Sequence, residues 1–353
     1  MLLELLTKNG SDLFITSRHP PTLRVNGSLQ PLDMPESTPE EVEAIIRRFV
    51  SEADFERLEE DQDIDYAYEV RLPGFGMRRF RGCAFYQRLG LSAVLRTIPV
   101  QIPTCNELLL PPEVMKLIEF HQGLVLVTGP TGSGKTTTLA SLVNHINNTR
   151  PLHVITIEDP IEFIYPVNKC MVVQRQVGTH VESFSSALRS ALREDPDVIL
   201  VGELRDLDTI SLAITAAETG HLVLGTLHTL SAAQTINRAV NVFPPSRQAQ
   251  VRVMLAESLR GVLSQQLIPR IDGNSRVVAT ELMICNSAIS TLIRDAKLHQ
   301  INSSIQTGTK QGMRLMDQSL LELVESHQID PHDALDRSID KNTFANTIRS
   351  YLE

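Results

Sequence analysis

The clearest chemical signature of this chain lies in residues 129–136, which read GPTGSGKT. This stretch satisfies the pattern G-x-x-x-x-G-K-[ST], a phosphate-binding P-loop. Its glycines allow a tight turn that points successive backbone N–H groups at phosphate oxygens. Lys135 would place a positive charge near the β- and γ-phosphates, and the Thr136 hydroxyl would coordinate Mg²⁺. The sequence therefore predicts a nucleoside triphosphate site rather than a Gly-rich turn that binds nothing.

The segments on both sides of this loop provide the context that the motif requires. Residues 123–127 are typical of a buried strand, and apolar residues recur at helical spacing over residues 137–146. A strand, a loop and a helix in this order are the setting in which P-loops occur. The residues expected to contact ATP are Gly129, Pro130, Thr131, Gly132, Ser133, Gly134, Lys135, Thr136 and Thr137.

Two acidic segments could supply catalytic carboxylates. Glu203 follows the apolar run 198–201, and ligands of open parallel sheets lie at the carboxyl ends of strands. There Glu203 would position Mg²⁺ or polarise the attacking water, the alternative being a solvated loop acid. Residues 158–162 (EDPIE) also follow an apolar run, and carboxylates so close together need a cation or arginines. One of these acids is expected to orient water or metal, although such a run also occurs as a surface patch.

Two histidines, His221 and His228, bracket a strand-like run. An interval of seven residues would place them on opposite faces of a strand, so a shared metal ion is not expected. Thr226 and His228 could sense a γ-phosphate by hydrogen bonding, whereas a core or interface histidine is the ordinary alternative for each.

Five arginines crowd the segment before residue 98. They could form a solvated basic face, or some could reach a nucleotide held by another domain or subunit. Arginine fingers of that kind are worth roughly 10³–10⁵ in rate. The five are Arg78, Arg79, Arg81, Arg88 and Arg96.

The hydrophobic pattern divides the chain into regions that could position these residues. Residues 1–98 mix strand-like runs with helical patterns, which indicates an α+β domain. A linker over residues 99–112 contains several prolines. Beyond it, over residues 113–285, strands alternate with helices and predict an open, mostly parallel sheet of the α/β class. Residues 286–353 are expected to form a helical C-terminal region.

Local signals make this division more specific. Asn26 and Gly27 predict a hairpin turn, and Thr38, Pro39 and Glu41 predict a helix start with a capping box. Two sets of apolar residues have the spacing of amphipathic helices. One set is Val251, Leu255, Leu259, Val262 and Leu263, expected on one long helix, and the other is Met313, Met316, Leu320, Leu323 and Val324.

Composition limits the remaining classes. The 353 residues carry a formal net charge of −9, which argues against direct binding to nucleic acid as a main role. No apolar run approaches the length of a membrane span, about 18 residues, and the N-terminus lacks the basic region of a signal peptide. The four cysteines are scattered, which fits reduced cytosolic thiols and gives no zinc site.

The order of these motifs resembles that of the type IV pilus retraction ATPases, the PilT/PilU family within the secretion ATPase superfamily. The P-loop is followed by a segment similar to an Asp box at 157–163, a Walker B segment at 195–206 and a His box at 219–229. The likeness covers nearly the whole chain, and the Walker B segment and His box together are specific to the superfamily.

The resemblance implies a PAS-like N-terminal domain, a RecA-like P-loop ATPase domain with a helical tail, and a homohexameric ring. It also implies roles for individual residues. Glu203 would be the catalytic glutamate and Mg²⁺ neighbour, Glu162 the Asp-box glutamate, His221 and His228 the His-box pair, and Arg81 and Arg96 the arginines that reach nucleotide. Arg294 falls where these proteins carry a C-terminal motif needed for retraction.

The implied function is an ATP-hydrolysing motor that powers type IV pilus retraction and twitching motility. It would work in the cytoplasm at the inner face of the bacterial inner membrane, alone or with a paralogous retraction ATPase. Hydrolysis would swing the two domains about the linker, and the ring would pass this movement to a membrane platform protein.

Three alternatives remain open: a pilus extension or type II secretion ATPase, an accessory nucleotide-binding subunit, and a DNA-translocating RecA-like motor. Some segments of the chain are more similar to PilT and others to PilU, so the paralogue stays open. The N-terminal segment and residues 333–349 are closer to PilU, whereas the His box and residues 304–308 are closer to PilT.

Overall fold

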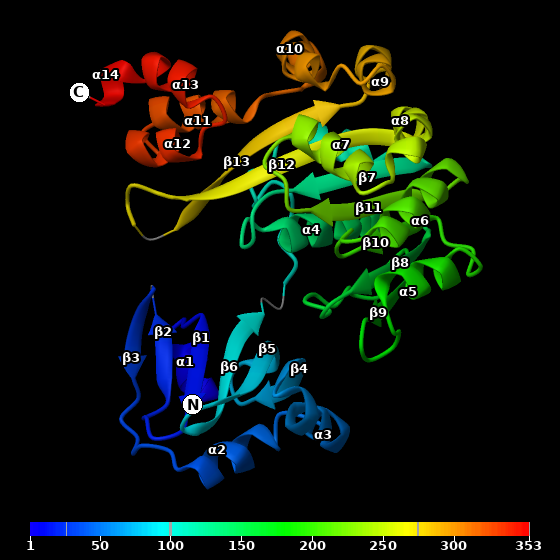
Figure 1. Ribbon diagram of the computed structural model, residues 1–353. Helices are drawn as coiled ribbons and strands as arrows, with labels where there is room; N and C mark the ends of the chain where they lie inside the picture. Colours follow the sequence, from blue (N-terminus) through cyan, green and yellow to red (C-terminus); the bar gives the residue numbers. More distant parts are fainter. Residues whose placement is uncertain (26, 99–100, 274, 353) are drawn as a thin grey trace. The chain divides into compact units, whose positions relative to one another are not determined.

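The computed structural model describes residues 1–25, 27–98, 101–273 and 275–352 (Figure 1). The chain separates into two compact units. The first comprises Met1–Gln101 with Pro160–Ile164, and the second comprises Ile102–Asp159 with Tyr165–Glu353. Each unit has its own sheet and its own buried core. Asn26 of the predicted hairpin turn and residues 99–100 of the predicted linker lie outside the described residues.

The first unit is built on an antiparallel sheet with the strand order β3-β2-β1-β6-β5-β4. Its strands are β1 (Asp12–Thr16), β2 (Thr22–Val25), β3 (Ser28–Pro31), β4 (Asp63–Leu72), β5 (Gly76–Gln87) and β6 (Gly90–Ile98). Its helices α1 (Leu2–Thr7), α2 (Pro39–Ile46) and α3 (Glu52–Asp61) share one apolar core with the sheet. The unit is therefore α+β, with helices and strands stabilised by the same buried side chains.

The predicted start of α2 is confirmed. The Thr38 hydroxyl accepts a hydrogen bond from the Glu41 N–H at 3.2 Å, and the Glu41 carboxylate accepts one from the Thr38 N–H at 2.9 Å. Pro39 occupies the first helical position, where its missing N–H costs nothing. The helix ends at Ile46.

The second unit contains a sheet with the strand order β13-β12-β7-β11-β10-β8-β9. Neighbouring strands are parallel except for the antiparallel pair β12 and β13. The strands are β7 (Gly123–Thr128), β8 (His153–Glu158), β9 (Met171–Gln176), β10 (Val198–Val201), β11 (Leu222–Leu227), β12 (Leu259–Pro269) and β13 (Arg276–Ile284). The predicted strands near residues 124, 154, 198 and 222 are thus confirmed as parallel neighbours.

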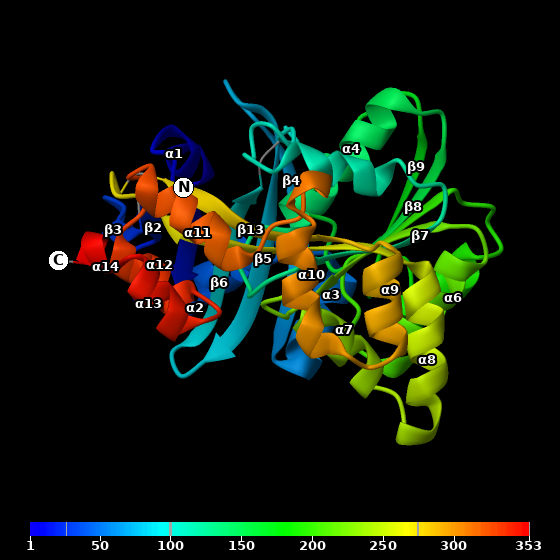
Figure 2. The ribbon, with the colours of Figure 1, turned by 90° about the horizontal axis from the view of Figure 1, so that it is seen from above.

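Helices cover this sheet and extend beyond it. They are α4 (Lys135–Thr149), α5 (Phe184–Ala191), α6 (Leu207–Glu218), α7 (Ala232–Asn241), α8 (Pro245–Ser258), α9 (Ser287–Arg294), α10 (Ile301–Thr307), α11 (Met316–Glu325), α12 (Pro331–Arg337), α13 (Lys341–Thr347) and α14 (Arg349–Leu352). Short 3-10 segments lie at Pro112–Ile118, Leu298–Gln300 and Thr309–Gln311. Figure 2 shows α8, α9 and α10 side by side. Among the helices in the described ranges, none is long and apolar enough to cross a bilayer.

The predicted long helix through Val251 and Leu263 is wrong. Helix α8 ends at Ser258, and Leu259 begins strand β12 with extended backbone angles. The strand lies between β7 and β13 and is buried along most of its length, so its apolar residues do not alternate with polar ones. A strand buried on both faces cannot be told from a buried helix by periodicity alone. Hydrogen bonds to the neighbouring strands decide the conformation here.

A separate apolar cluster joins the C-terminal helices to the far ends of β12 and β13. It includes Ile268, Val277, Met316, Leu320 and Phe344. Met313, predicted on the same helix as Met316, precedes α11 instead, in a segment whose Arg314 forms an antiparallel bridge with Leu282. The C-terminal helices are thus anchored to the same sheet that carries the P-loop.

Candidate functional site

The P-loop connects the buried strand β7 to helix α4. Gly129, Gly132 and Gly134 have φ angles of +145°, +78° and +87°, a region that side chains with a Cβ rarely adopt. At Gly129 a Cβ would also collide with the backbone oxygen of Gln265 and the Ser133 side chain. The loop therefore depends on glycine for both its turn and its close packing against β12.

The amino end of α4 is suited to an anion. The helix has no side-chain cap, and its first turn (residues 135–138) carries no acidic residue. Its first N–H groups and its positive dipole end are therefore left for a ligand. The buried Ser133 hydroxyl also has no hydrogen-bond partner among the described residues. These features fit the phosphates of a nucleotide, as the sequence predicts for residues 129–137.

Lys135 begins α4 and is buried. Its ammonium donates hydrogen bonds to the backbone oxygens of Gly129 at 2.9 Å and Pro130 at 3.0 Å. Burial lowers the pKa of Lys135, and the nearby Glu203 carboxylate opposes part of this effect. The two oxygens that bind this buried cation are neutral, so a phosphate that reached the ammonium would offset more of its desolvation.

Gln265 of β12 holds the loop in place, a role that the sequence analysis missed. Its amide nitrogen donates to the Ser133 backbone oxygen at 2.6 Å, and its amide oxygen accepts from the Thr138 hydroxyl at 2.9 Å. One position earlier, the Ser264 hydroxyl accepts a hydrogen bond from Thr128 at 2.8 Å. Neighbouring polar residues within a buried strand, at 264–266, are the signal that could have indicated this role.

Glu203 lies just beyond the carboxyl end of β10, as predicted. One carboxylate oxygen is 2.8 Å from Nε of Arg205, and the other is 3.1 Å from Nε2 of His228. His228 follows β11, which lies between β7 and β10 in the sheet. Adjacent parallel strands thus bring Lys135, Glu203 and His228 to one edge. The fold therefore assembles a cation, a carboxylate and an imidazole from three distant parts of the sequence.

The other predicted histidine, His221, lies at the amino end of β11, whereas His228 follows its carboxyl end. Its Nδ1 is 3.0 Å from the backbone oxygen of Ala216 at the end of α6. The two histidines lie seven positions apart along this strand, about 23 Å at roughly 3.3 Å per residue. The structure therefore does not bring His221 together with Glu203, and its catalytic role stays a prediction.

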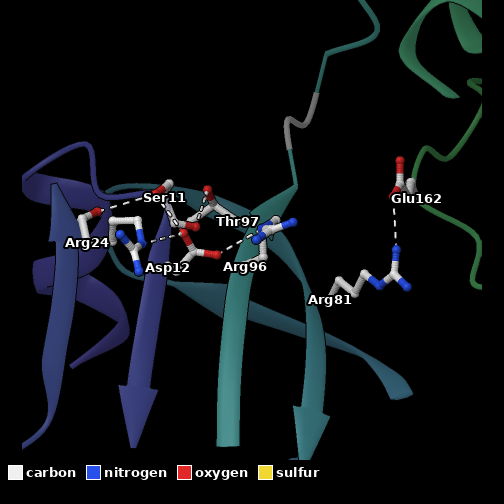
Figure 3. Close-up of polar contacts among 7 residues, drawn as sticks. All are labelled: Ser11, Asp12, Arg24, Arg81, Arg96, Thr97 and Glu162. Atoms are coloured by element: carbon white, nitrogen blue, oxygen red, sulfur yellow. Dashed lines mark hydrogen bonds and ion pairs between the residues drawn. The ribbon is translucent and has the colours of Figure 1, made fainter. Parts of the chain in front are cut away.

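The three acids of residues 158–162 differ in burial and in hydrogen-bond partners. Glu158 is buried at the end of β8, where it accepts hydrogen bonds from Thr156 at 2.7 Å and Gln174 at 3.2 Å. Asp159 is exposed. Glu162 groups with the first unit, where its carboxylate is 3.5 Å from a guanidinium nitrogen of Arg81 (Figure 3). Each of the three acids therefore has its own surroundings.

Arg81 and Arg96, the two arginines expected to reach nucleotide, have carboxylate partners within the first unit. Arg81 lies 3.6 Å from Asp65 in addition to Glu162. Figure 3 shows Asp12 between Arg24 and Arg96, with Nε of Arg96 donating to Asp12 at 2.8 Å. The side chain of Arg96 is 69% exposed while that of Asp12 is 6% exposed. Because the guanidinium is exposed, exchanging this partner for another anion would cost little.

A magnesium ion would be held largely by the nucleotide. Thr136 lies exposed in the first turn of α4, so its hydroxyl is free to bind a cation that also contacts phosphate oxygens. Within the described ranges, no group of three or more His, Cys, Asp or Glu side chains could hold a metal ion by itself. The donor set fits Mg²⁺ bound together with a triphosphate.

Comparison with known proteins places the chain among motor ATPases. A family model described as type II/IV secretion system protein matches residues 1–349. Over 338 residues the chain is 48% identical to the type IV pilus retraction ATPase PilT of Pseudomonas aeruginosa, covering 96% of this chain and 97% of that protein. It is 39% identical over 331 residues to the type IV pilus ATPase PilU of the same organism, covering 94% and 86%.

A solved structure agrees with these relatives. The crystal structure of the pilus retraction motor PilT with bound ADP matches this fold with a TM-score of 0.89 and 46% sequence identity, covering 97% of each chain. The predicted resemblance is therefore confirmed, together with the predicted α/β ATPase fold.

Proposed function

The chain belongs to the family of type II/IV secretion system proteins and is a pilus-retraction ATPase within it, and we propose that the residues around its P-loop form the hydrolytic site. The observation that carries this proposal is the convergence of Lys135, Glu203 and His228 at the carboxyl ends of neighbouring parallel strands. In such sheets this edge is where ligands bind.

Each residue has a separate task in this proposal. The N–H groups of residues 132–137 and the ammonium of Lys135 bind the phosphates of ATP. Thr136 would hold Mg²⁺, which when bound neutralises charge on the β- and γ-phosphate oxygens. Glu203 orients the attacking water. Arg205 and His228 hold the carboxylate of Glu203 in place. His228 also lies where it can sense the γ-phosphate.

The first unit would complete the site in a ring. We assign the PAS-like domain to residues 1–98, the linker to 99–112, the RecA-like domain to 113–285 and the helical region to 286–353. Arg81 and Arg96 would exchange their carboxylate partners for nucleotide when the domains close. Stabilising charge in the transition state in this way couples hydrolysis to domain movement.

The assembly would be a homohexamer, alone or with a paralogue of the PilU type. It would act in the cytoplasm at the inner face of the bacterial inner membrane, where a platform protein receives its movement. Direct binding to nucleic acid plays no part in this proposal.

The hydrolytic site is tested by steady-state ATPase assays of Lys135→Ala and Glu203→Gln. Both variants should lose at least about 100-fold in kcat, since each removes a group that stabilises charge or water in the transition state. The matched control is Lys310→Ala, which removes an exposed lysine of the same unit and should keep parental activity. Near-parental turnover by Lys135→Ala would refute the assignment.

The biological role is tested by deleting the coding sequence in the host and scoring pili by electron microscopy. A retraction motor predicts excess, immotile pili, restored to normal by the parental chain and not by Lys135→Ala. Bald cells would instead identify an extension ATPase. ATPase activity that rises with added DNA and falls steeply with salt would identify a DNA motor.

A further inference from the structure

Glu281 is a buried carboxylate that the hydrolytic site does not use. It lies in β13, opposite Ser264 of β12, and is 2% exposed. One carboxylate oxygen accepts a hydrogen bond from the N–H of Ala232 at 2.7 Å, and the other accepts one from the N–H of Met316 at 3.3 Å. Burying a carboxylate costs free energy unless hydrogen bonds compensate for the lost hydration, and these two N–H groups supply such bonds.

These partners are the first residues of two helices. Ala232 begins α7, and Met316 begins α11. The amino end of a helix carries unpaired N–H groups and a partial positive charge. One carboxylate thus accepts a hydrogen bond from the first N–H group of each helix and links the two helix starts. Glu281 ties α7, which packs against the sheet, to the C-terminal helical cluster that begins with α11.

Helix α7 is in turn coupled to the hydrolytic site. Only residues 229–231 separate His228 from the start of α7. The Thr229 hydroxyl is 2.7 Å from that of Thr235 in α7, and the Leu230 N–H donates to the side chain of Gln234 at 3.3 Å. The segment that carries His228 is therefore hydrogen-bonded to the first turns of α7. A shift of α7 would displace the imidazole that contacts Glu203.

From this arrangement we propose that Glu281 is a positioning residue that holds the amino end of α7, and thereby His228, in register with Glu203. The same carboxylate also binds the start of α11. A movement of the C-terminal helices would therefore change the position of His228 relative to Glu203. The inference rests on the proposed hydrolytic site, since it assigns His228 a part in turnover. Glu281 itself touches neither nucleotide nor the reacting atoms.

The test is Glu281→Gln in the full chain, alone and combined with His228→Ala. Glutamine keeps the shape but offers one acceptor oxygen, so one helix start loses its partner. We expect kcat to fall about tenfold, the cost of about one buried hydrogen bond. The affinity for a fluorescent ADP analogue should stay within about twofold, because the P-loop contacts are unchanged. In the His228→Ala background the same substitution should change kcat less than about twofold.

Two further variants complete the experiment. Ala232→Pro removes the N–H that Glu281 binds at a helix position that tolerates proline, and it should reproduce the effect of Glu281→Gln and its dependence on His228. It also serves if Glu281→Gln fails to fold. Ser319→Ala removes the bond from α11 to the backbone N–H of Thr280 without touching α7, and should keep kcat within about twofold of the parent.

The outcomes separate cleanly. Parental kcat in Glu281→Gln, or an equal loss in both backgrounds, overturns the positioning role, as does a loss of ADP affinity that matches the loss of kcat. A His228→Ala variant with parental kcat also overturns it, while leaving the P-loop and Glu203 assignment intact. Parental activity in Lys135→Ala, by contrast, refutes the proposed function itself.

Discussion

Replacing Glu281 by glutamine should remove a loss of stability that the parent protein shows as pH rises from 5.5 to 8. Burial raises the pKa of Glu281 to about 7 from the ordinary 4.5, with Asp317 adding to the rise. The N–H groups of Ala232 and Met316 oppose it, because they favour the ionised form. A raised pKa means that the folded state binds the proton more tightly than the unfolded state does.

The sign and size of the effect follow from linkage. The contribution of Glu281 to stability is fully present below about pH 4.5 and is lost as pH rises through about 7. The full difference of about 2.5 pKa units corresponds to about 3 kcal/mol, at 1.36 kcal/mol per unit. Between pH 5.5 and pH 8 the loss is about 2 kcal/mol. Glutamine does not titrate, so Glu281→Gln should escape this loss.

The assay is urea denaturation of the full chain and of Glu281→Gln at pH 5.5 and pH 8. The difference in free energy of unfolding between variant and parent should grow by about 2 kcal/mol in favour of the variant at the higher pH. Other titrating groups cancel in this difference. The control is Glu325→Gln, which removes an exposed carboxylate of α11 and should show no such trend. A difference that is constant, or that shrinks toward pH 8, would refute the reasoning.

Three other substitutions test contacts within each of the two units. Gln265→Leu leaves the Ser133 backbone oxygen without its buried amide partner, so ADP affinity should weaken about tenfold in a fluorescence titration. Unchanged affinity would show that Gln265 does not hold the P-loop in its binding conformation. Gly129→Ala places a Cβ against backbone at a φ of +145° and should abolish ADP binding, whereas full binding would show that the loop has room. Asp12→Asn removes the charge that Arg96 binds and, because the Arg96 guanidinium is exposed, should destabilise the first unit by only about 0.5–1 kcal/mol in urea denaturation; a loss of several kcal/mol would contradict this.

Local features of the fold followed from the sequence because short-range chemistry decides them. The capping box of α2 needs only Thr38, Pro39 and Glu41, all within one turn of helix. The P-loop needs glycines at fixed positions between a buried strand and a helix. The placement of Glu203 at a strand end followed from the rule that parallel strands present their carboxyl ends at one edge.

Strand β12 shows where sequence reasoning failed. Its residues 259–269 have helical spacing of apolar side chains, and the preceding segment is indeed helical. What makes them a strand is pairing with β7, which lies far away in the chain, and with β13, the strand that follows next. Without this strand, Gln265 cannot be placed beside the P-loop.

The sequence by itself determined that this chain binds a nucleoside triphosphate and which residues begin that site, because the P-loop is one continuous segment whose conformation its own glycines set. Only the tertiary structure decided what surrounds it. Pairing of β10 with β11 brings Glu203 to His228 and keeps His221 at the other end of β11, whereas Glu162 lies beside Arg81 of the first unit. Glu281 is buried between two helix starts. Such contacts join residues that lie tens of positions apart, which no local pattern records.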